Sequence, residues 1–226
     1  MVKGLSEIAG KKVITARGAQ AFADVDDLAR RTELNRHDME ALAAAGALAD
    51  LSGHRRNALW DVSGVERMPP LLADSAIDEL PPALIAPSEG EDIVADYASL
   101  GLTLGRHPLA LLRERLQRQH MLTAAELREL PHGRIARVTG LVTGRQRPGT
   151  ASGVTFVTLE DETDMVNVIV WRDLAERQRK ELLRSNLLTV FGTLERAGEV
   201  VHLIAGRLRD QSAMLGKLTT RSRDFH

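Results

Sequence analysis

Arginines are the side chains in this sequence with the clearest potential for chemistry, and many of them lie in its second half. A guanidinium can bind a phosphate, and a flat side chain beside it lets a base stack, so such a set can hold one nucleic-acid strand. The candidates for this contact are Arg134, Arg137, Arg145, Arg147, Trp171, Arg196, Arg207 and Arg209.

Aromatic side chains, which a single-strand site uses for stacking, make up only 3% of the chain. We expect Phe156 and Phe191 to fill the protein interior, whereas Trp171 lies at the end of a strand and is a candidate for either stacking or packing. A site this poor in aromatic residues should bind weakly unless the planes of arginine side chains supply the stacking.

Helix N-termini near the start of the chain form a second candidate site. Ser6 and Asn35 have N-cap patterns, and the backbone N–H groups of a helix start can hold a phosphate without reading base sequence. Arg55 and Arg56 are either further phosphate contacts or a solvated helix end. The candidates for contact with duplex DNA are Gly4, Ser6, Lys11, Lys12, Asn35, Arg36, Arg55 and Arg56.

Carboxylates that could hold catalytic metals do not occur in a suitable pattern. Two-metal phosphoryl transfer needs carboxylates that converge on the metals. Asp24, Asp26 and Asp27 instead lie at a predicted helix start, and residues 160–164 form an acidic turn between strands, so we interpret both clusters as structural. The seven histidines show no pair at metal-ligand spacing. We predict no catalytic residue, metal site or cofactor in this chain.

The elements that must position the arginines of the second half are predicted to form a barrel. Five apolar runs alternate with turns, and a helix that begins near Asp173 separates the third run from the fourth. This order of strands and helix is that of an OB-fold. The predicted strands lie at 135–142, 154–159, 165–171, 187–194 and 200–208, with an exposed basic loop at 145–153.

The whole chain is predicted to be an α+β multidomain protein. Its N-terminal part contains capped helices joined by tight turns, and two capping boxes, Ser88 with Glu91 and Thr123 with Glu126, start later helices. The tail is either a docking peptide or a disordered end. The predicted segments are a tandem helix-hairpin-helix module at 1–65, an acidic proline-rich linker at 66–90, connecting helices at 91–132, a five-stranded OB barrel at 133–210 and a C-terminal tail at 211–226.

Charge is unevenly distributed along the chain. The net charge is -1, but residues 133–226 hold 15 Lys and Arg against 11 Asp and Glu, whereas residues 1–132 hold 15 against 20. Nucleic-acid affinity should therefore be local and sensitive to salt. The chain has no cysteine and no apolar run long enough to span a bilayer, so we expect a soluble cytoplasmic protein with no membrane partner.

Several motifs together resemble the C-terminal part of error-prone C-family DNA polymerases of the ImuC type, which are relatives of the bacterial DNA polymerase III alpha subunit. The resemblance covers nearly the whole chain. The motifs that carry it lie at 22–31, 42–48, 52–56, 96–108, 155–162, 166–171 and 221–226.

The resemblance implies that the chain is a fragment of a longer polymerase. In such enzymes a tandem helix-hairpin-helix module grips duplex DNA and an OB domain lies near single-stranded template, while the carboxylates that hold Mg²⁺ lie in a catalytic part not included here. The family is linked to damage-induced mutagenesis with the partner ImuB, which is thought to supply the sliding-clamp contact. An alternative is that the barrel and tail are a protein assembly surface that docks a partner such as ImuB.

Overall fold

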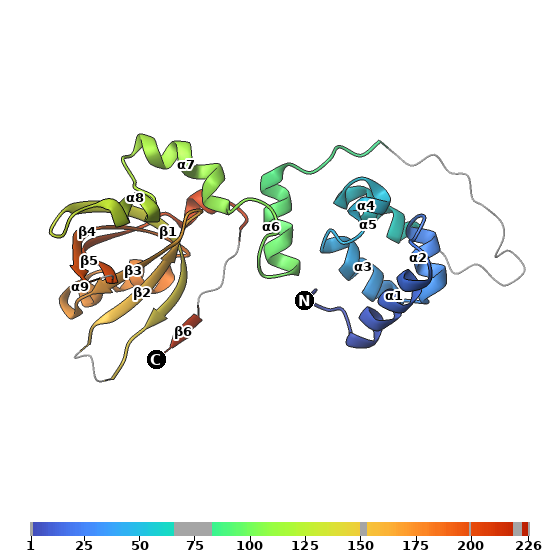
Figure 1. Cartoon of the computed structure of the whole chain (residues 1–226), viewed down its shortest axis with the longest axis horizontal. Coiled ribbons are helices and arrows are strands. Elements are labelled where there is room, and N and C mark those ends of the chain that lie inside the picture. Colours follow the sequence, from blue (N-terminus) through green and yellow to red (C-terminus); the bar gives the residue numbers. More distant parts are fainter. Residues whose placement is uncertain (1, 66–82, 150–152, 199, 219–222, 226) are drawn as a thin grey trace, which may run out of the picture. The chain divides into compact units, whose positions relative to one another are not determined.

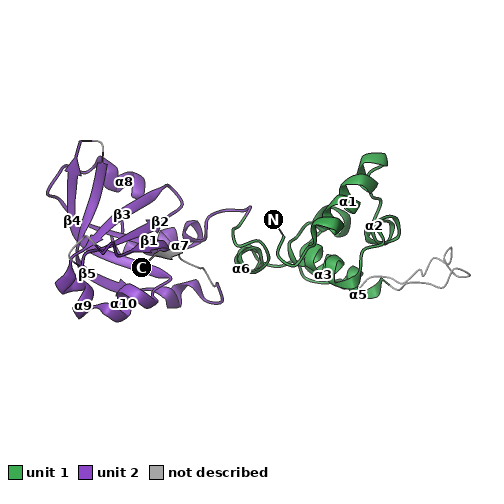
Figure 2. Ribbon diagram, turned by 90° about the horizontal axis from the view of Figure 1, so that it is seen from below, with its two compact units in different colours: residues 1–103 green, residues 104–226 purple. Residues whose placement is uncertain are grey.

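The computed structural model describes residues 2–65, 83–149, 153–198, 200–218 and 223–225 (Figure 1). The chain divides into two compact units, residues 1–103 and residues 104–226 (Figure 2). Most of the predicted linker, residues 66–82, lies outside the described residues, as does the centre of the predicted basic loop at 150–152.

Unit 1 is helical, and local capping determines where several of its helices begin. The side chains of Ser6, Asn35 and Ser88 each accept a hydrogen bond from the backbone N–H three residues further along, which satisfies a donor at the helix start. The helices are α1 (Glu7–Ala19), α2 (Val25–Thr32), α3 (Arg36–Ala44), α4 (Ala49–Ser52), α5 (Arg55–Gly64) and α6 (Glu89–Ser99).

A single apolar core joins helices α1, α2, α3 and α5. It includes Leu28, Met39, Leu42 and Val62, all of which are buried. Helix α6 belongs to the same unit, and the Lys3 ammonium donates to the carbonyl oxygens of its residues 97 and 98 at 3.1 and 2.9 Å. A cation at this position satisfies carbonyls that the end of a helix leaves unpaired.

Unit 2 contains a closed five-stranded barrel, as predicted for an OB-fold. The strands are hydrogen-bonded in the order β2-β3-β5-β4-β1, and pairing of β1 with β2 closes the barrel. Its core is lined by buried Val and Leu side chains from every strand. The strands are β1 (Ile135–Gln146), β2 (Thr155–Glu160), β3 (Met165–Val170), β4 (Leu187–Ala197) and β5 (Val200–Asp210).

Two short helices, α9 (Arg172–Arg177) and α10 (Arg179–Arg184), lie between β3 and β4, where one helix was predicted. In β4, Gly192 stands at a register shift against β5. A Cβ atom at this position would lie 2.3 Å from the carbonyl oxygen of Ile204. Glycine therefore allows the two strands to approach where the ladder is irregular.

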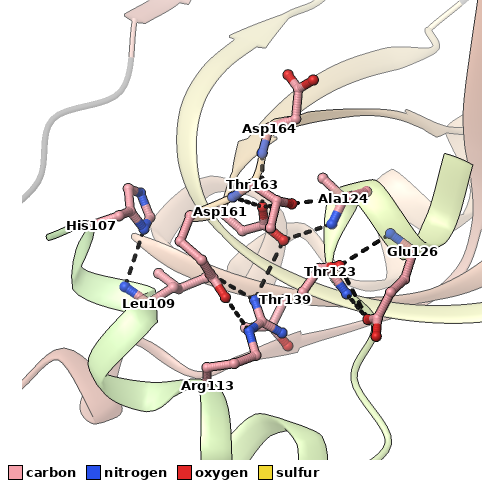
Figure 3. A network of polar contacts seen from close by, with 12 residues as sticks. His107, Leu109, Arg113, Thr123, Ala124, Glu126, Thr139, Asp161, Thr163 and Asp164 are labelled. Carbon is pink, nitrogen blue, oxygen red and sulfur yellow. Dashed lines mark hydrogen bonds and ion pairs between the residues drawn. The ribbon is translucent and has the colours of Figure 1, made fainter.

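Helices α7 (Pro108–Arg118) and α8 (Ala124–Glu129) pack on the barrel through a polar network around the turn between β2 and β3 (Figure 3). The Asp161 carboxylate accepts from the backbone N–H of Ala124 at 2.7 Å and faces the Arg113 guanidinium at 3.4 Å. Arg113 also forms an ion pair with Glu162. The segment predicted as one set of connecting helices is therefore divided, with α6 in unit 1 and α7 and α8 in unit 2.

Part of the predicted tail forms a strand. Residues Arg223–Phe225 (β6) pair in parallel with Gly144, Arg145 and Gln146 at the end of β1. The preceding segment includes a 3-10 turn at Ser212–Leu215. In the described parts of the chain, no helix combines the length and the apolar character needed to cross a lipid bilayer.

Candidate nucleic-acid interface

Arg137 and Arg207 lie on either side of the Phe191 ring on the outer surface of the barrel. The strand register pairs Phe191 of β4 with Arg137 of β1 and with Arg207 of β5. The two guanidinium carbons lie 5.8 and 5.4 Å from the ring centroid. Each exposed cation is thus within cation–π distance of an aromatic ring. We call these three residues the arginine–phenylalanine ladder.

A row of mainly apolar side chains crosses the strands beside this ladder. The register aligns Phe156 of β2 with Ile169 of β3 and Ile204 of β5, and then with Thr193 of β4 and Ile135 of β1. Phe156 is 37% exposed and Ile135 is 80% exposed. Apolar surface next to cations suits the bases and phosphates of a single strand.

Arg209 extends the cationic side of this surface. It pairs with Thr189 of β4, whose hydroxyl lies 2.7 Å from that of Thr139 in β1. The arginine–phenylalanine ladder, the row of apolar side chains and Arg209 together form one surface, which we call the binding face. Its residues are Ile135, Arg137, Phe156, Ile169, Phe191, Thr193, Ile204, Arg207 and Arg209.

The expectation that Phe156 and Phe191 fill the interior is wrong. Burial alternates along β2 and around Phe191 in β4, with Val157 and Val190 inside and the two phenylalanines outside. Neither ring belongs to the buried core of the barrel. The scarce aromatic residues therefore lie where bases could stack, next to the cations.

The prediction that Arg145 lies in an exposed loop is wrong. Strand β1 continues to Gln146, and Arg145 is only 6% exposed. Its Nε donates to the carbonyl of Leu182 at 2.6 Å, and its Nη2 donates to the carbonyl of Ser185. The guanidinium thus satisfies carbonyls at the end of α10 and attaches this helix to the barrel.

The other single-strand candidates lie at strand ends. Arg134 is exposed just before β1, and Arg147 is exposed just after it. Arg196 is directed away from the binding face, because its guanidinium donates to the carbonyls of Arg128 and Leu130 at the C-terminal end of α8. Trp171 is 55% exposed and precedes α9.

The predicted duplex site is partly assembled in unit 1. Gly4 has a φ of +84°, and a Cβ atom there would lie 3.3 Å from the His37 ring, so the turn before α1 lies beside the first turn of α3. Lys11 and Arg36 are 73% exposed in their side chains and pair only with Glu7 and Glu40 of their own helices. Lys12 is exposed as well. With the Ser6 and Asn35 caps, these residues place two helix starts and three cations on one unit.

Arg55 and Arg56 both pair with carboxylates of α6, Arg55 nearly buried and Arg56 partly exposed. The Arg55 side chain is 12% exposed and pairs with Asp96 and, at 3.3 Å, with Asp92 of α6. Arg56 pairs with Glu91 at 2.7 Å. Both guanidiniums therefore hold α6 against α5, a structural function that neither sequence interpretation included.

The acidic clusters have structural partners, as interpreted from the sequence. Asp24 caps α2 by accepting from the backbone N–H of Asp27 at 2.7 Å. A hydrogen bond from the Ala23 backbone, with ion pairs to Arg30 and Arg31, lowers the pKa of Asp27. Over the described residues, no three histidine or acidic side chains are grouped as metal ligands would be.

Comparison with known families agrees with this geometry. A helix-hairpin-helix motif family matches residues 1–58, and an OB-fold nucleic acid binding domain family matches residues 136–210. The first match lies in unit 1, and the second, a family described as nucleic acid binding, lies in unit 2. Among solved structures, an asparaginyl-tRNA synthetase of Pyrococcus horikoshii aligns over 39% of this chain and 22% of the synthetase chain, at 20% identity. The TM-score of 0.34 is too low to support an argument.

Curated relatives match the whole chain. An error-prone DNA polymerase of Alkalilimnicola ehrlichii is 57% identical over 226 residues, which is 100% of this chain and 22% of the relative. One from an Azoarcus species is 56% identical over 230 residues, 100% of this chain and 21% of the relative. The chain spans about a fifth of the length of these relatives. It corresponds throughout to the C-terminal part of error-prone DNA polymerases, as its motifs predicted.

Proposed function

We propose that this chain is the DNA-holding part of an error-prone DNA polymerase, in which unit 2 binds single-stranded template and unit 1 binds duplex. The arginine–phenylalanine ladder is the observation that carries the proposal. It combines two exposed cations and an aromatic ring on a surface with further apolar side chains. Such a surface can bind a strand without reading its sequence.

On the binding face, phosphates would pair with Arg137, Arg207 and Arg209, and bases would stack on Phe156 and Phe191. Counterion release makes the phosphate contribution dependent on salt, with a slope of about -0.7 per phosphate for single strands. Stacking on an aromatic ring adds about 1–3 kcal/mol per base. With two rings on this face, affinity would be modest and the sequence preference small.

In unit 1, duplex DNA would approach the starts of α1 and α3. The helix N-termini attract phosphate through their free N–H groups and the helix dipole. Lys11, Lys12 and Arg36 are the exposed cations near these starts. Contacts of this kind position a duplex but do not specify its sequence.

Polymerase activity belongs, in this proposal, to the longer protein. The relatives named as error-prone DNA polymerases are about five times as long as this chain. Phosphoryl transfer with Mg²⁺, and a role in translesion synthesis and damage-induced mutagenesis in the cytoplasm, would therefore depend on residues outside the present sequence.

The test is fluorescence anisotropy with labelled single-stranded and duplex DNA over a salt series. The variant R137A/R207A should lose about tenfold or more in single-strand affinity, with a salt slope shallower by about 1.4, because two phosphate contacts are removed. Its duplex affinity should not change. The control R177A/R184A removes two exposed arginines of α9 and α10 and should behave like wild type. Unchanged single-strand binding by R137A/R207A would refute the proposal for the binding face.

A second function, docking of a protein partner such as ImuB with indirect contact to a sliding clamp, is favoured by one feature. Ile135 is 80% exposed on the binding face, beside the partly exposed Ile169 and Ile204. An apolar row of this kind also suits a protein interface. Saturable ImuB binding that survives R137A/R207A and is lost in I135D would support docking.

A further inference from the structure

A groove of about 250 Å³ lies away from the binding face, between the end of β1, the start of β2 and helices α9 and α10. Its apolar lining comes from Ala175, Leu182 and Leu183, together with Thr155. Leu183 is 46% exposed, so the groove presents apolar surface to solvent. A groove of this size has room for a group such as a base or a sugar.

Three exposed arginines from three different elements line this groove. Arg147 follows β1, Arg172 starts α9 and Arg179 starts α10. Among the described residues that line the groove, Glu176 is the only one with a carboxylate, which accepts from Arg172 at 2.8 Å. That hydrogen bond lowers the pKa of Glu176, so the carboxylate stays ionised and offsets one of the three charges. The groove keeps an excess of positive charge beside apolar surface.

The groove wall is built by the buried Arg145. Its hydrogen bonds to the carbonyls of Leu182 and Ser185 hold α10 against the strand and so position Arg179 and Leu183. Arg145 is 6% exposed, and its guanidinium is bound to backbone atoms of α10 and the residue after it. The exposed guanidiniums of Arg147, Arg172 and Arg179, beside this apolar wall, suit a phosphate with its adjoining base or sugar.

The position of the groove relates it to the binding face. Thr155, in the groove, is directly followed by Phe156, which belongs to the binding face. Arg172, in the groove, is directly preceded by Trp171, which is 55% exposed. Because consecutive strand residues point to opposite faces, a single strand that leaves the face past Phe156 would pass around the start of β2 to reach Trp171 and the three arginines.

We propose that this groove is a second subsite for the same DNA strand, which binds one phosphate and the nucleoside next to it. The inference rests on the proposed function of the binding face. It adds Arg147, Arg172, Arg179 and Leu183 as contacts and extends the length of strand that the barrel covers. An acidic, apolar peptide has similar chemistry, but the continuity with Phe156 and Trp171 favours the DNA strand.

The experiment compares a short and a long oligothymidylate, about 4 and about 16 nucleotides, the range that one OB-fold covers. The whole chain carries R172A/R179A, and the matched control R177A/R184A removes two other exposed arginines from the same helices. We expect R172A/R179A to lose about tenfold in affinity for the long oligomer, with a shallower salt slope, and to bind the short oligomer as wild type does. The control should bind both as wild type does.

L183E serves as an independent variant, because it keeps every arginine and introduces a negative charge at the apolar wall. It should also weaken binding of the long oligomer only, and circular dichroism should show the barrel intact in both variants. Equal losses for both lengths, or no loss for the long one, would overturn the subsite. So would weakened binding of a Glu- and Phe-rich peptide by R172A/R179A without any effect on DNA. Failure of wild type to bind either oligomer would instead refute the proposed function itself.

Discussion

The two units use neighbouring arginines in opposite ways. In unit 1, Arg55 and Arg56 pair with carboxylates of α6 and fasten one helix to another. In unit 2, Arg137 and Arg207 lie exposed beside an aromatic ring. The difference teaches that an arginine that meets carboxylates of another packed helix serves the fold, whereas one without such a helix against it stays exposed.

The largest effect should come from R55A. The side chains of Arg55 and Asp96 are 12% and 10% exposed, so the substitution removes a nearly buried cation from a nearly buried carboxylate. We expect unit 1 to lose about 3 kcal/mol of unfolding free energy. Urea unfolding followed by Trp60 fluorescence in a W171F background measures this loss.

The matched control for R55A is R56A, because its ion pair with Glu91 is largely exposed. It should leave the urea midpoint almost unchanged, since exposed pairs contribute little. If R55A and R56A lowered the urea midpoint equally, the difference in burial between the two ion pairs would not determine how much each contributes to stability.

The second effect concerns the aromatic ring of the ladder. F191A should weaken binding of single-stranded DNA by about 1–2 kcal/mol through lost stacking. The salt slope should stay at the wild-type value, because no phosphate contact is removed. A slope that falls as in R137A/R207A would mean that Phe191 acts by orienting the arginines. Anisotropy titrations at several salt concentrations separate the two results.

A smaller effect is expected from His107, which caps α7 with Nδ1 accepting from the backbone N–H of Leu109 at 3.2 Å (Figure 3). Burial lowers the pKa of His107 more than Glu160, Glu162 and Asp161 raise it. The unfolded chain therefore binds this proton more readily, and the associated stability is complete above about pH 6.5 and declines as pH falls below it.

The variant H107N keeps a side chain that can cap the helix but does not titrate. Its urea midpoint should decline less than that of wild type between about pH 7 and pH 5. Parallel pH curves for the two proteins would contradict this role of His107.

The smallest effect is expected from R36A in unit 1. Loss of one phosphate contact should lower the salt slope by about 0.9, so the deficit in duplex affinity relative to wild type should be about threefold larger at 50 mM than at 200 mM salt. Its helix partner Glu40 offers the control E40A, which frees Arg36 and should strengthen duplex binding slightly. If neither substitution alters duplex affinity, the start of α3 is not a DNA contact.

Features that depend on a few consecutive residues could be predicted from the sequence. The caps at Ser6, Asn35, Ser88 and Thr123 each need only a side chain and a backbone N–H three residues away. The order of strands and helix also follows from local alternation and turns, which is why the OB-fold could be recognised.

The errors concern residues whose partners lie far away in the chain. Arg145 was assigned to a loop because Gly144 breaks the apolar pattern, but a register shift at Val142/Gly144 lets β1 continue. Its acceptors, Leu182 and Ser185, are 37 and 40 residues away. The α6 carboxylates that form ion pairs with Arg55 and Arg56 lie 35 to 41 residues further along the chain.

Local sequence patterns also could not predict whether a strand residue points into the barrel or out of it. Phe156 and Ile169 alternate with valines that are equally apolar, so hydrophobicity alone does not distinguish the two faces. The sequence by itself determined the two modules, their helix starts and the supply of arginines. Only the tertiary structure decided which arginines meet carboxylates, which meet rings and which remain exposed, because strand register and helix packing bring together residues that local rules treat separately.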